Sequence, residues 1–507
     1  MKAKSICIFV FVLFLLFSFF SCSYDLYDET RAKPAITDSH EFLVLLKATG
    51  EYTISEEKLE KMVTGLLNPK SEGRHIAADK KVEITDSKKL PIAKPKISAA
   101  RSAAVEQENV DVYAFTTQNA TNGMEGYVLG STDMRIGNIL AVADGKLPEA
   151  EEDAFTDIIF DGLAAYIDRT IQEYESIDDA EIQAALENPD LRSVAPPVNT
   201  NPGTSGWTDP EWSVKGLIHH WYPNAANVVW AGWGWWFDGE YHARTPVNWH
   251  QGNPYNYYVS RAKNGTMANS PSGCGPVAVA QVMAYHGWPK KCAMDITIPN
   301  VNMNIKDYVY NWVNMRNDFA TNKETDPIEG GAKDVAVLMY HIRKAAGLAE
   351  GETTAIYSDV VSAFHKMKYW APGSFMSYDV NKIRSSLAAK RPVVAYGSKD
   401  LLWHGHFWVI DGICRMEYRE VLSNGAEWSW SPRDFVHCNV GWGDDLNQQG
   451  LNYYKLRNAW YISELFDFGG DRHALIRSTQ ENYYQYYLKI LPGIYPDTSL
   501  HLYPFFM

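Results

Sequence analysis

A cysteine stands at the start of an apolar run with helical spacing, in the stretch SGCGPVAVAQVMAYHGWP, residues 272–289. Pro276 suits the first turn of a helix, where its missing N–H is not needed, and Ser272 or Gly273 can cap that helix. Cys274 is therefore predicted at a helix N-terminus, where the helix dipole stabilises a thiolate, the reactive form of cysteine. The alternative is a buried structural cysteine.

A nucleophilic thiol needs a base, and the stretch RPVVAYGSKDLLWHGHFWVIDGI offers His404 and His406. Both would face the same side of a strand. His406 leads directly into an apolar run and is predicted on a buried strand, whereas His404 lies nearer the loop. His286 follows Cys274 on the same predicted helix, about 18 Å away at the helical rise, and cannot serve. A metal cluster of His404, His406 and His437 is the alternative use of these side chains.

Acyl transfer by a thiol also needs a group that orients the histidine and donors for the oxyanion. The stretch FVHCNVGWGDD places Asn439 at the end of a predicted strand. The stretch TPVNWHQGNPYN places Gln251 upstream of the cysteine, where its amide and the N–H of Cys274 could act together. No metal or other cofactor is expected. The candidate residues of the substrate cleft are Gly273, Gly405 and Trp442.

The order Gln251, Cys274, His406, Asn439 resembles that of papain-like cysteine peptidases. The phrases QGNPYN, GCGPVAVAQVMAYHGWP, GHFWVIDG and HCNVGWG resemble one branch of them, the streptopain-like peptidases of family C10, which are secreted bacterial enzymes. RPVVAYG and YNWVNM also resemble that family, and the likeness covers most of residues 110–491.

The resemblance implies an α+β fold, in which a helical part carries the cysteine and an antiparallel sheet part carries the histidine and asparagine. It implies that Cys274 is the nucleophile, His406 the general base and acid, Asn439 the residue that orients His406, and Gln251 an oxyanion donor. The substrates would be proteins or peptides, with an apolar residue two positions before the cut.

Two features depart from the family pattern: Cys274 is followed by Gly275 and Pro276, which is tighter than usual, and Asn439 is followed by Val440. Val440 stands where these peptidases carry a tryptophan that shields the histidine–asparagine pair from water, although Trp442 matches the second tryptophan. Two rivals stay open. One is another acyl-transfer enzyme of the same fold, such as a peptidoglycan amidase or a transglutaminase-like enzyme; the other is a catalytically silent surface binding protein.

The N-terminal residues predict export. Lys2 and Lys4 precede an apolar run at residues 6–20, which is typical of a signal peptide, and Ser21-Cys22 resembles a bacterial lipobox. We expect a lipoprotein-type signal at residues 1–21, lipidation of Cys22, and a location at the bacterial cell envelope or outside the cell. Contact with a membrane would be only through this lipid.

Three further segments are predicted along the chain. Residues 22–187 contain helical runs, three strand-like runs and an amphipathic helix, which together resemble the small α+β propeptide of the family, an intramolecular inhibitor. Residues 188–206 are rich in Pro, Asn, Ser and Gly and are predicted to be an exposed linker with the processing site. Residues 207–507 are the predicted peptidase domain.

Composition bounds the remaining classes. The chain has 507 residues and a formal net charge of −14, which argues against a nucleic-acid partner. The cysteines after residue 22 are widely spaced. The sequence leaves open whether Cys414 and Cys438 form a disulfide. The Trp-rich stretch VVWAGWGWWFDG is expected to form a hairpin on the core, and the acidic GDDLNQQG to be a solvated turn rather than a calcium loop.

Overall fold

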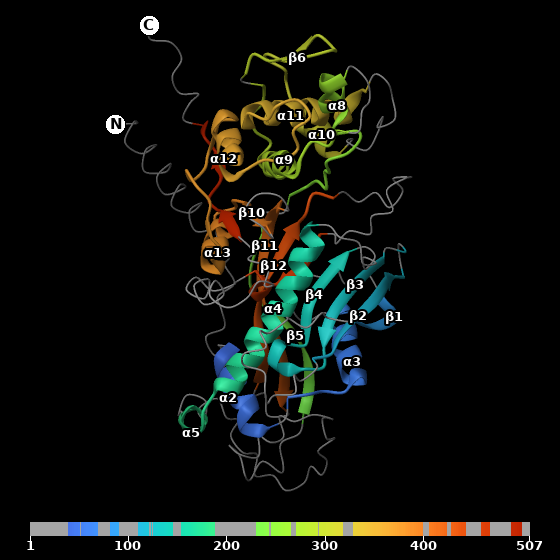
Figure 1. Cartoon of the computed structure of the whole chain (residues 1–507). Helices are drawn as coiled ribbons and strands as arrows, with labels where there is room; N and C mark the ends of the chain where they lie inside the picture. The colour runs from blue at the N-terminus through green and yellow to red at the C-terminus, as the bar shows by residue number, and fades with distance from the viewer. Residues whose placement is uncertain are drawn as a thin grey trace, which may run out of the picture.

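The structure is a computed structural model of the whole chain. The residues that it describes are 39–50, 52–68, 82–90, 110–120, 123, 125–144, 154–187, 230–242, 245–264, 270–292, 294–317, 328–398, 405–422, 427–442, 458–466 and 488–498. Within them the fold is α+β, with one large antiparallel sheet, a group of helices beyond one end of it and further helices alongside it (Figure 1). None of the helices in these ranges is long and apolar enough to cross a membrane.

The sheet is built on two long neighbouring strands, β11 (Gly405–Leu422) and β12 (Glu427–Asn439), which pair antiparallel along most of their length. The shorter strands around them are β9 (Met376–Ser377), β10 (Val393–Ser398), β13 (Ala459–Ile462) and β14 (Lys489–Leu491). The first half of β11 pairs with β10, and the second half pairs with β5 (Trp230–His242). The Trp-rich stretch therefore forms one long strand against β11 rather than the expected hairpin, since the far half of β11 offers a free edge there.

The helical part lies beyond one end of these strands (Figure 1). Its helices are α8 (Tyr257–Asn264), α9 (Cys274–His286), α10 (Trp312–Asn317), α11 (Gly330–Ala346) and α12 (Tyr357–Lys366). Helix α9 is apolar all round and its residues from Gly275 to Ala284 are buried, as expected for a helix at the centre of a core. A helix α13 (Val380–Ala388) packs against β10 and β11 instead. Short strand pairs are β6 (Thr297–Ile298) with β7 (Met303–Asn304), and β8 (Tyr369–Trp370) with β15 (Tyr495–Pro496).

The N-terminal region has the predicted mixture of helices and strands. Its elements are α2 (Ser39–Thr49), α3 (Glu56–Leu67), β1 (Val82–Leu90), β2 (Val112–Asn119), β3 (Glu125–Ser131), η1 (Met134–Ile136), β4 (Ile139–Asp144), α4 (Ala154–Ser176) and α5 (Asp179–Glu187). The three predicted strands and the amphipathic helix are confirmed. Strand β1, which is mostly exposed and pairs with β2, was not among the predicted strands.

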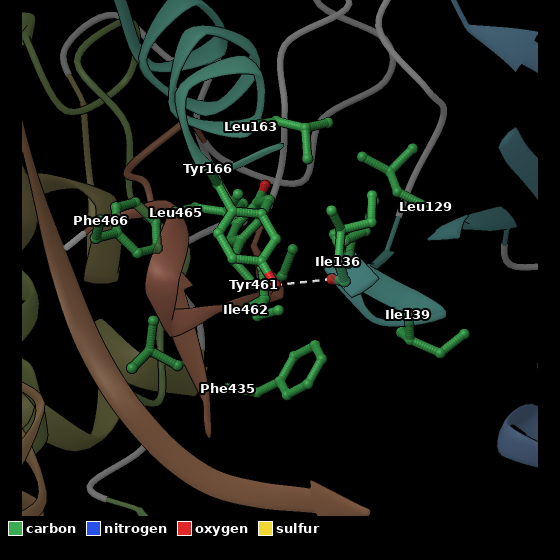
Figure 2. Close-up of a cluster of buried hydrophobic side chains, with 14 of the residues drawn as sticks. Leu129, Ile136, Ile139, Leu163, Tyr166, Phe435, Tyr461, Ile462, Leu465 and Phe466 are labelled. Carbon is green, nitrogen blue, oxygen red and sulfur yellow. Dashed lines mark hydrogen bonds between the residues drawn. The ribbon is translucent and has the colours of Figure 1, made fainter. Parts of the chain in front are cut away.

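The N-terminal region and the rest of the chain share one sheet and one core. Strand β4 pairs antiparallel with β13, so the sheet runs from β1 through β4 into β13, β12 and β11. Figure 2 shows apolar side chains from both sides of this junction packed together, with Tyr166 of α4 donating to the carbonyl oxygen of Ile136 at 2.8 Å. The proposed boundary at residues 188–206 lies outside the described residues and stays a prediction, as do the signal segment, Cys22 and His404.

Candidate active site

Cys274 is the first residue of α9, as predicted. Gly273 before it has φ 95°, and a Cβ there would approach the Thr353 carbonyl oxygen to 2.8 Å, so the turn into the helix requires glycine. The carbonyl oxygen of Ser272 accepts a hydrogen bond from the buried guanidinium of Arg343 on α11 at 2.9 Å. Arg343 thereby fixes the turn that presents the cysteine.

The thiol of Cys274 is half-buried beside strand β11. Burial raises its pKa, while backbone hydrogen bonds from Phe407, Gly275 and Cys274 itself act in the opposite direction. The sequence predicted a thiolate stabilised by the helix N-terminus, and the structure adds a stronger opposing effect, because desolvation favours the neutral thiol. The bond with Phe407 also locates the sulfur, since Phe407 directly follows His406 in β11.

His406 is buried on β11, as predicted, with 3% of its surface exposed. Its Nε2 lies 2.8 Å from the carbonyl oxygen of Val440. A carbonyl oxygen only accepts, so Nε2 carries the proton and Nδ1 of the neutral ring is left as the basic nitrogen. The ring stacks on Trp442, with centroids 4.5 Å apart and planes 17° apart. Trp442 therefore covers the histidine, a role that the family pattern assigns to a ring at position 440.

Asn439 lies at the end of β12, directly before Val440. Its Nδ2 donates to the Val247 carbonyl and the Thr245 hydroxyl, at 2.9 and 2.8 Å. Its Oδ1 accepts from Gln281, at 2.8 Å, and from the N–H of Gly441, at 3.2 Å.

The direct Asn439–His406 hydrogen bond that the predicted orienting role requires is absent from the contacts of the described residues. The acceptor for His406 in this structure is the backbone carbonyl of the next residue, Val440. Asn439 can therefore act on His406 only through the neighbouring peptide, and its predicted role stays a prediction in this indirect form.

Gln251 lies beside the nucleophile turn. Its carbonyl oxygen accepts from the N–H of Ser272 at 2.8 Å, and its neighbour His250 forms a β-bridge with Trp442. The segment that carries the predicted oxyanion donor thus meets both the turn before Cys274 and the segment after Asn439. Gly405, also predicted as a cleft residue, has a steric explanation: the hydroxyl oxygen of Tyr396 occupies the space that a Cβ would need.

Several groups at the site were not singled out from the sequence. They are the Val440 carbonyl, Gln281 of α9, Thr245 and Asn458. Gln281 carried a visible signal, because a glutamine on an apolar, buried helix needs a polar partner. A backbone carbonyl carries no such signal, and Thr245 and Asn458 are ordinary polar residues in loops.

The geometry also bears on the disulfide and on the metal cluster that the sequence left open. Cys292, Cys414 and Cys438 are buried, and no disulfide joins Cys414 to Cys438. His437 is bound through Nδ1 to Asp411. Across the described ranges, no three His, Cys, Asp or Glu side chains are grouped to hold a metal ion. His404 and the GDDLNQQG segment lie outside those ranges.

A thiol at the N-terminus of a central helix, packed on an antiparallel sheet that carries a buried histidine, is consistent with a papain-like peptidase domain. Residues 249–449 match the family model described as the Peptidase C10 family, which confirms the predicted resemblance over this segment. The match spans Gln251, Cys274, His406 and Asn439. No curated protein matches the chain.

Proposed function

We propose that this protein is an exported cysteine endopeptidase that is made as an inactive precursor. The observation that carries the proposal is the arrangement of Cys274 at the start of α9 beside β11. On β11, Nε2–H of His406 donates a hydrogen bond to the Val440 carbonyl. Nδ1 is then the nitrogen that can take the thiol proton.

In the proposed reaction, His406 Nδ1 takes the proton of Cys274 as the sulfur attacks the scissile carbonyl carbon. The side-chain amide of Gln251 and the N–H of Cys274 hold the resulting oxyanion. The carbon–nitrogen bond breaks as His406 gives its proton to the leaving amine, which leaves a thioester. Water, deprotonated by His406, then hydrolyses the thioester and releases the acid and the thiol.

A group of aromatic side chains on and near β11 supports the proposed preference for an apolar residue in the substrate. Phe407 follows the histidine, and its ring contacts Tyr396 at a centroid distance of 4.5 Å. Tyr357 and Phe375 are half-buried and complete the aromatic group, at centroid distances of 5.0 Å from each other and 4.8 Å from Tyr357 to Tyr396. Such rings would accept an apolar side chain of the substrate.

The proposal also includes export, lipidation of Cys22 and inhibition by the N-terminal region. The extensive contacts of that region support an inhibitory role. Buried Arg433 of β12 contacts the Tyr166 hydroxyl and the Arg135 carbonyl of the N-terminal region, at 3.4 and 3.3 Å. Such contacts would hold the region on the peptidase sheet until it is cut away.

Labelling and proteolysis together test the proposed activity. A peptidyl inhibitor with a thiol-reactive group should label Cys274, and the protein should cleave a denatured protein substrate. Cys274→Ala and His406→Ala should abolish cleavage, and Cys274→Ala should also abolish labelling, because the other described thiols are buried. Labelling without cleavage of any protein would favour another acyl-transfer reaction. Absence of both would indicate a silent binding protein.

A further inference from the structure

The amide of Asn439 is held in one orientation by its neighbours. The Val247 carbonyl can only accept, so the nitrogen Nδ2 must face it, at 2.9 Å. The oxygen Oδ1 then faces α9 and accepts from Nε2 of Gln281 at 2.8 Å. Both side chains are buried, with 1% of Asn439 and 0% of Gln281 exposed. The pair is therefore a defined, desolvated hydrogen bond between β12 and the helix of the nucleophile.

Gln281 ties the nucleophile helix to two other segments of the site. It lies seven residues after Cys274, two turns along α9. Besides Asn439, its Nε2 donates to the carbonyl of Trp249 at 3.3 Å, two residues before Gln251. The same helix approaches the strand end closely at Gly441, where a Cβ would lie 2.9 Å from Val277. Gln281 is thus placed to set how far α9 stands from the segments of Asn439 and Gln251.

The peptide of Val440 is held on both sides. Its carbonyl accepts from His406, and its N–H donates to Oδ1 of Asn458 at 3.0 Å. Nδ2 of Asn458 donates to Oδ1 of Asn248, which also accepts from Asn439 at 3.3 Å. The acceptor that fixes the His406 ring is therefore linked by side-chain amides to Asn439.

A buried carboxylate anchors this network on the sheet. Oδ2 of Asp411 accepts from the hydroxyl and the N–H of Thr245, at 2.8 and 2.9 Å, while Oδ1 contacts Nδ1 of His437. Because the Thr245 hydroxyl donates its hydrogen bond to Asp411, its oxygen can accept one from Asn439, at 2.8 Å. Thr245 is thereby a direct bridge from the strand β11 to Asn439.

We propose that Thr245, Gln281 and Asn458 are positioning residues of the peptidase, which act through Asn439 and the Val440 peptide to keep His406 in line with Cys274. The inference rests on the proposed function. It assigns the orientation of His406 to a hydrogen-bond network rather than to one asparagine side chain. This network reaches α9, the segment before Gln251 and the segment after Asn439.

A matched pair of variants at Thr245 tests the network. Thr245→Val keeps the shape but loses the hydroxyl, whereas Thr245→Ser keeps the hydroxyl. We expect Thr245→Val and Gln281→Leu to lower kcat by about 10²-fold, the order of loss expected when a reacting group is misplaced by about 1 Å. KM should change by about twofold or less, because ground-state binding is untouched. Thr245→Ser should retain the wild-type kcat.

A second readout separates positioning from loss of stability. The rate at which iodoacetamide labels Cys274, followed against pH, reports whether His406 still takes the thiol proton. In Thr245→Val and Gln281→Leu this profile should move to higher pH. Ser386→Ala removes a buried hydroxyl that bonds Arg391 and Gly493, away from the site. It should lower the thermal midpoint and leave the profile unchanged.

Combination with His406→Ala decides the route of action. In that background, Gln281→Leu and Thr245→Val should no longer change the labelling profile, because the residue through which they act is gone. Equal kcat for Thr245→Val and Thr245→Ser would overturn the inference, as would a profile that stays at the wild-type position. If the wild type is labelled at Cys274 but cleaves nothing, the proposed function fails while the labelling profiles still decide the positioning.

Discussion

The two reacting side chains lie in environments that work against their charged forms. Cys274 is half-buried and His406 is buried, so a resting thiolate–imidazolium pair must be stabilised by the few groups that reach it. Those groups include the backbone N–H donors around the sulfur and the Val440 carbonyl behind the histidine. Reactivity of the thiol therefore depends on proton transfer to His406 more than on the helix dipole.

The pH dependence of thiol labelling follows from this balance. Because burial raises the pKa of Cys274 above its ordinary value, the thiol of His406→Ala should become reactive only as pH rises past about 8.5, the usual cysteine value. In the wild type, His406 can accept the proton, so labelling should begin at lower pH. Rates of iodoacetamide labelling measured by mass spectrometry would show this difference. Superimposable profiles for the two proteins would contradict the pairing.

Position 440 has little room for a larger side chain. Val440 is 1% exposed within the core, and Trp442 already stacks on His406. We expect Val440→Trp to destabilise the protein by about 1–3 kcal/mol, the usual effect of overpacking. Activity should fall as the Val440 carbonyl is displaced. Chemical denaturation and peptide hydrolysis would measure the two effects, and Val440→Ile, a smaller enlargement, serves as the control.

At the scale of elements, patterns in the sequence predicted the helix and the strand that carry the catalytic candidates Cys274 and His406. The apolar run after Cys274 and the run after His406 are long and regular, and they became α9 and β11. Strand β1 could not be predicted in this way, because its sequence VEITDSKKL alternates only over its first residues and then becomes polar, and its structure comes from pairing with β2. The hydrogen-bond partner of His406 was equally out of reach, since it depends on which atoms meet across β11 and β12.

The helical part contains a buried histidine, His341, and a half-buried one, His286, which should make its stability depend on pH. Burial lowers the pKa of His341 to about 4, and the pKa of His286 likewise to about 4. Between about pH 6.5 and 4 the unfolded chain binds protons on these side chains and the folded protein does not. The free energy of unfolding should therefore fall as pH falls through this range.

Substitution can assign this acid sensitivity to α11. His341 bonds the hydroxyl of Tyr310 and the thiol of Cys292, so His341→Gln keeps a polar side chain that does not titrate. The thermal midpoint of His341→Gln should vary less between pH 4 and 6.5 than that of the wild type. His365→Gln, at an exposed position on α12, is the matched control and should leave the slope unchanged. An equal slope in all three proteins would show that His341 is not a source of the effect.

At the scale of the molecule, the N-terminal region is joined to the peptidase part more closely than the sequence indicated. Composition along the chain separated a small α+β unit from a larger domain, and each has its own periodic elements. The pairing of β4 with β13 carries no local signal, because any strand edge can accept another. Only the structure reveals that Tyr461, Ile462 and Phe466 are covered from the N-terminal side (Figure 2).

This junction leads to a prediction about activation. If the N-terminal region is a propeptide, wild-type protein kept under reducing conditions should convert to a product of roughly 300 residues by cleavage in or near residues 188–206. Cys274→Ala should stay full length. Gel mass and N-terminal sequencing over time would follow the conversion. An uncut precursor with full activity, or a mature N-terminus well before residue 111, would contradict the propeptide assignment.

Cleavage alone should not separate the two pieces. Release of the N-terminal piece would leave the β13 edge unpaired and would expose Arg433 together with the apolar cluster of Figure 2. Apolar burial contributes roughly 25 cal/mol per Å², so a cluster of this kind opposes dissociation. We therefore expect both pieces to co-elute in gel filtration directly after cleavage, and activity to appear only as the N-terminal piece is degraded or displaced. Arg433→Leu, which removes the bonds to Tyr166 and Arg135 and puts an apolar side chain in the same buried position, should shorten the delay between cleavage and activity. Activity that rises in step with cleavage in both proteins would show that the junction does not hold the cut propeptide in place.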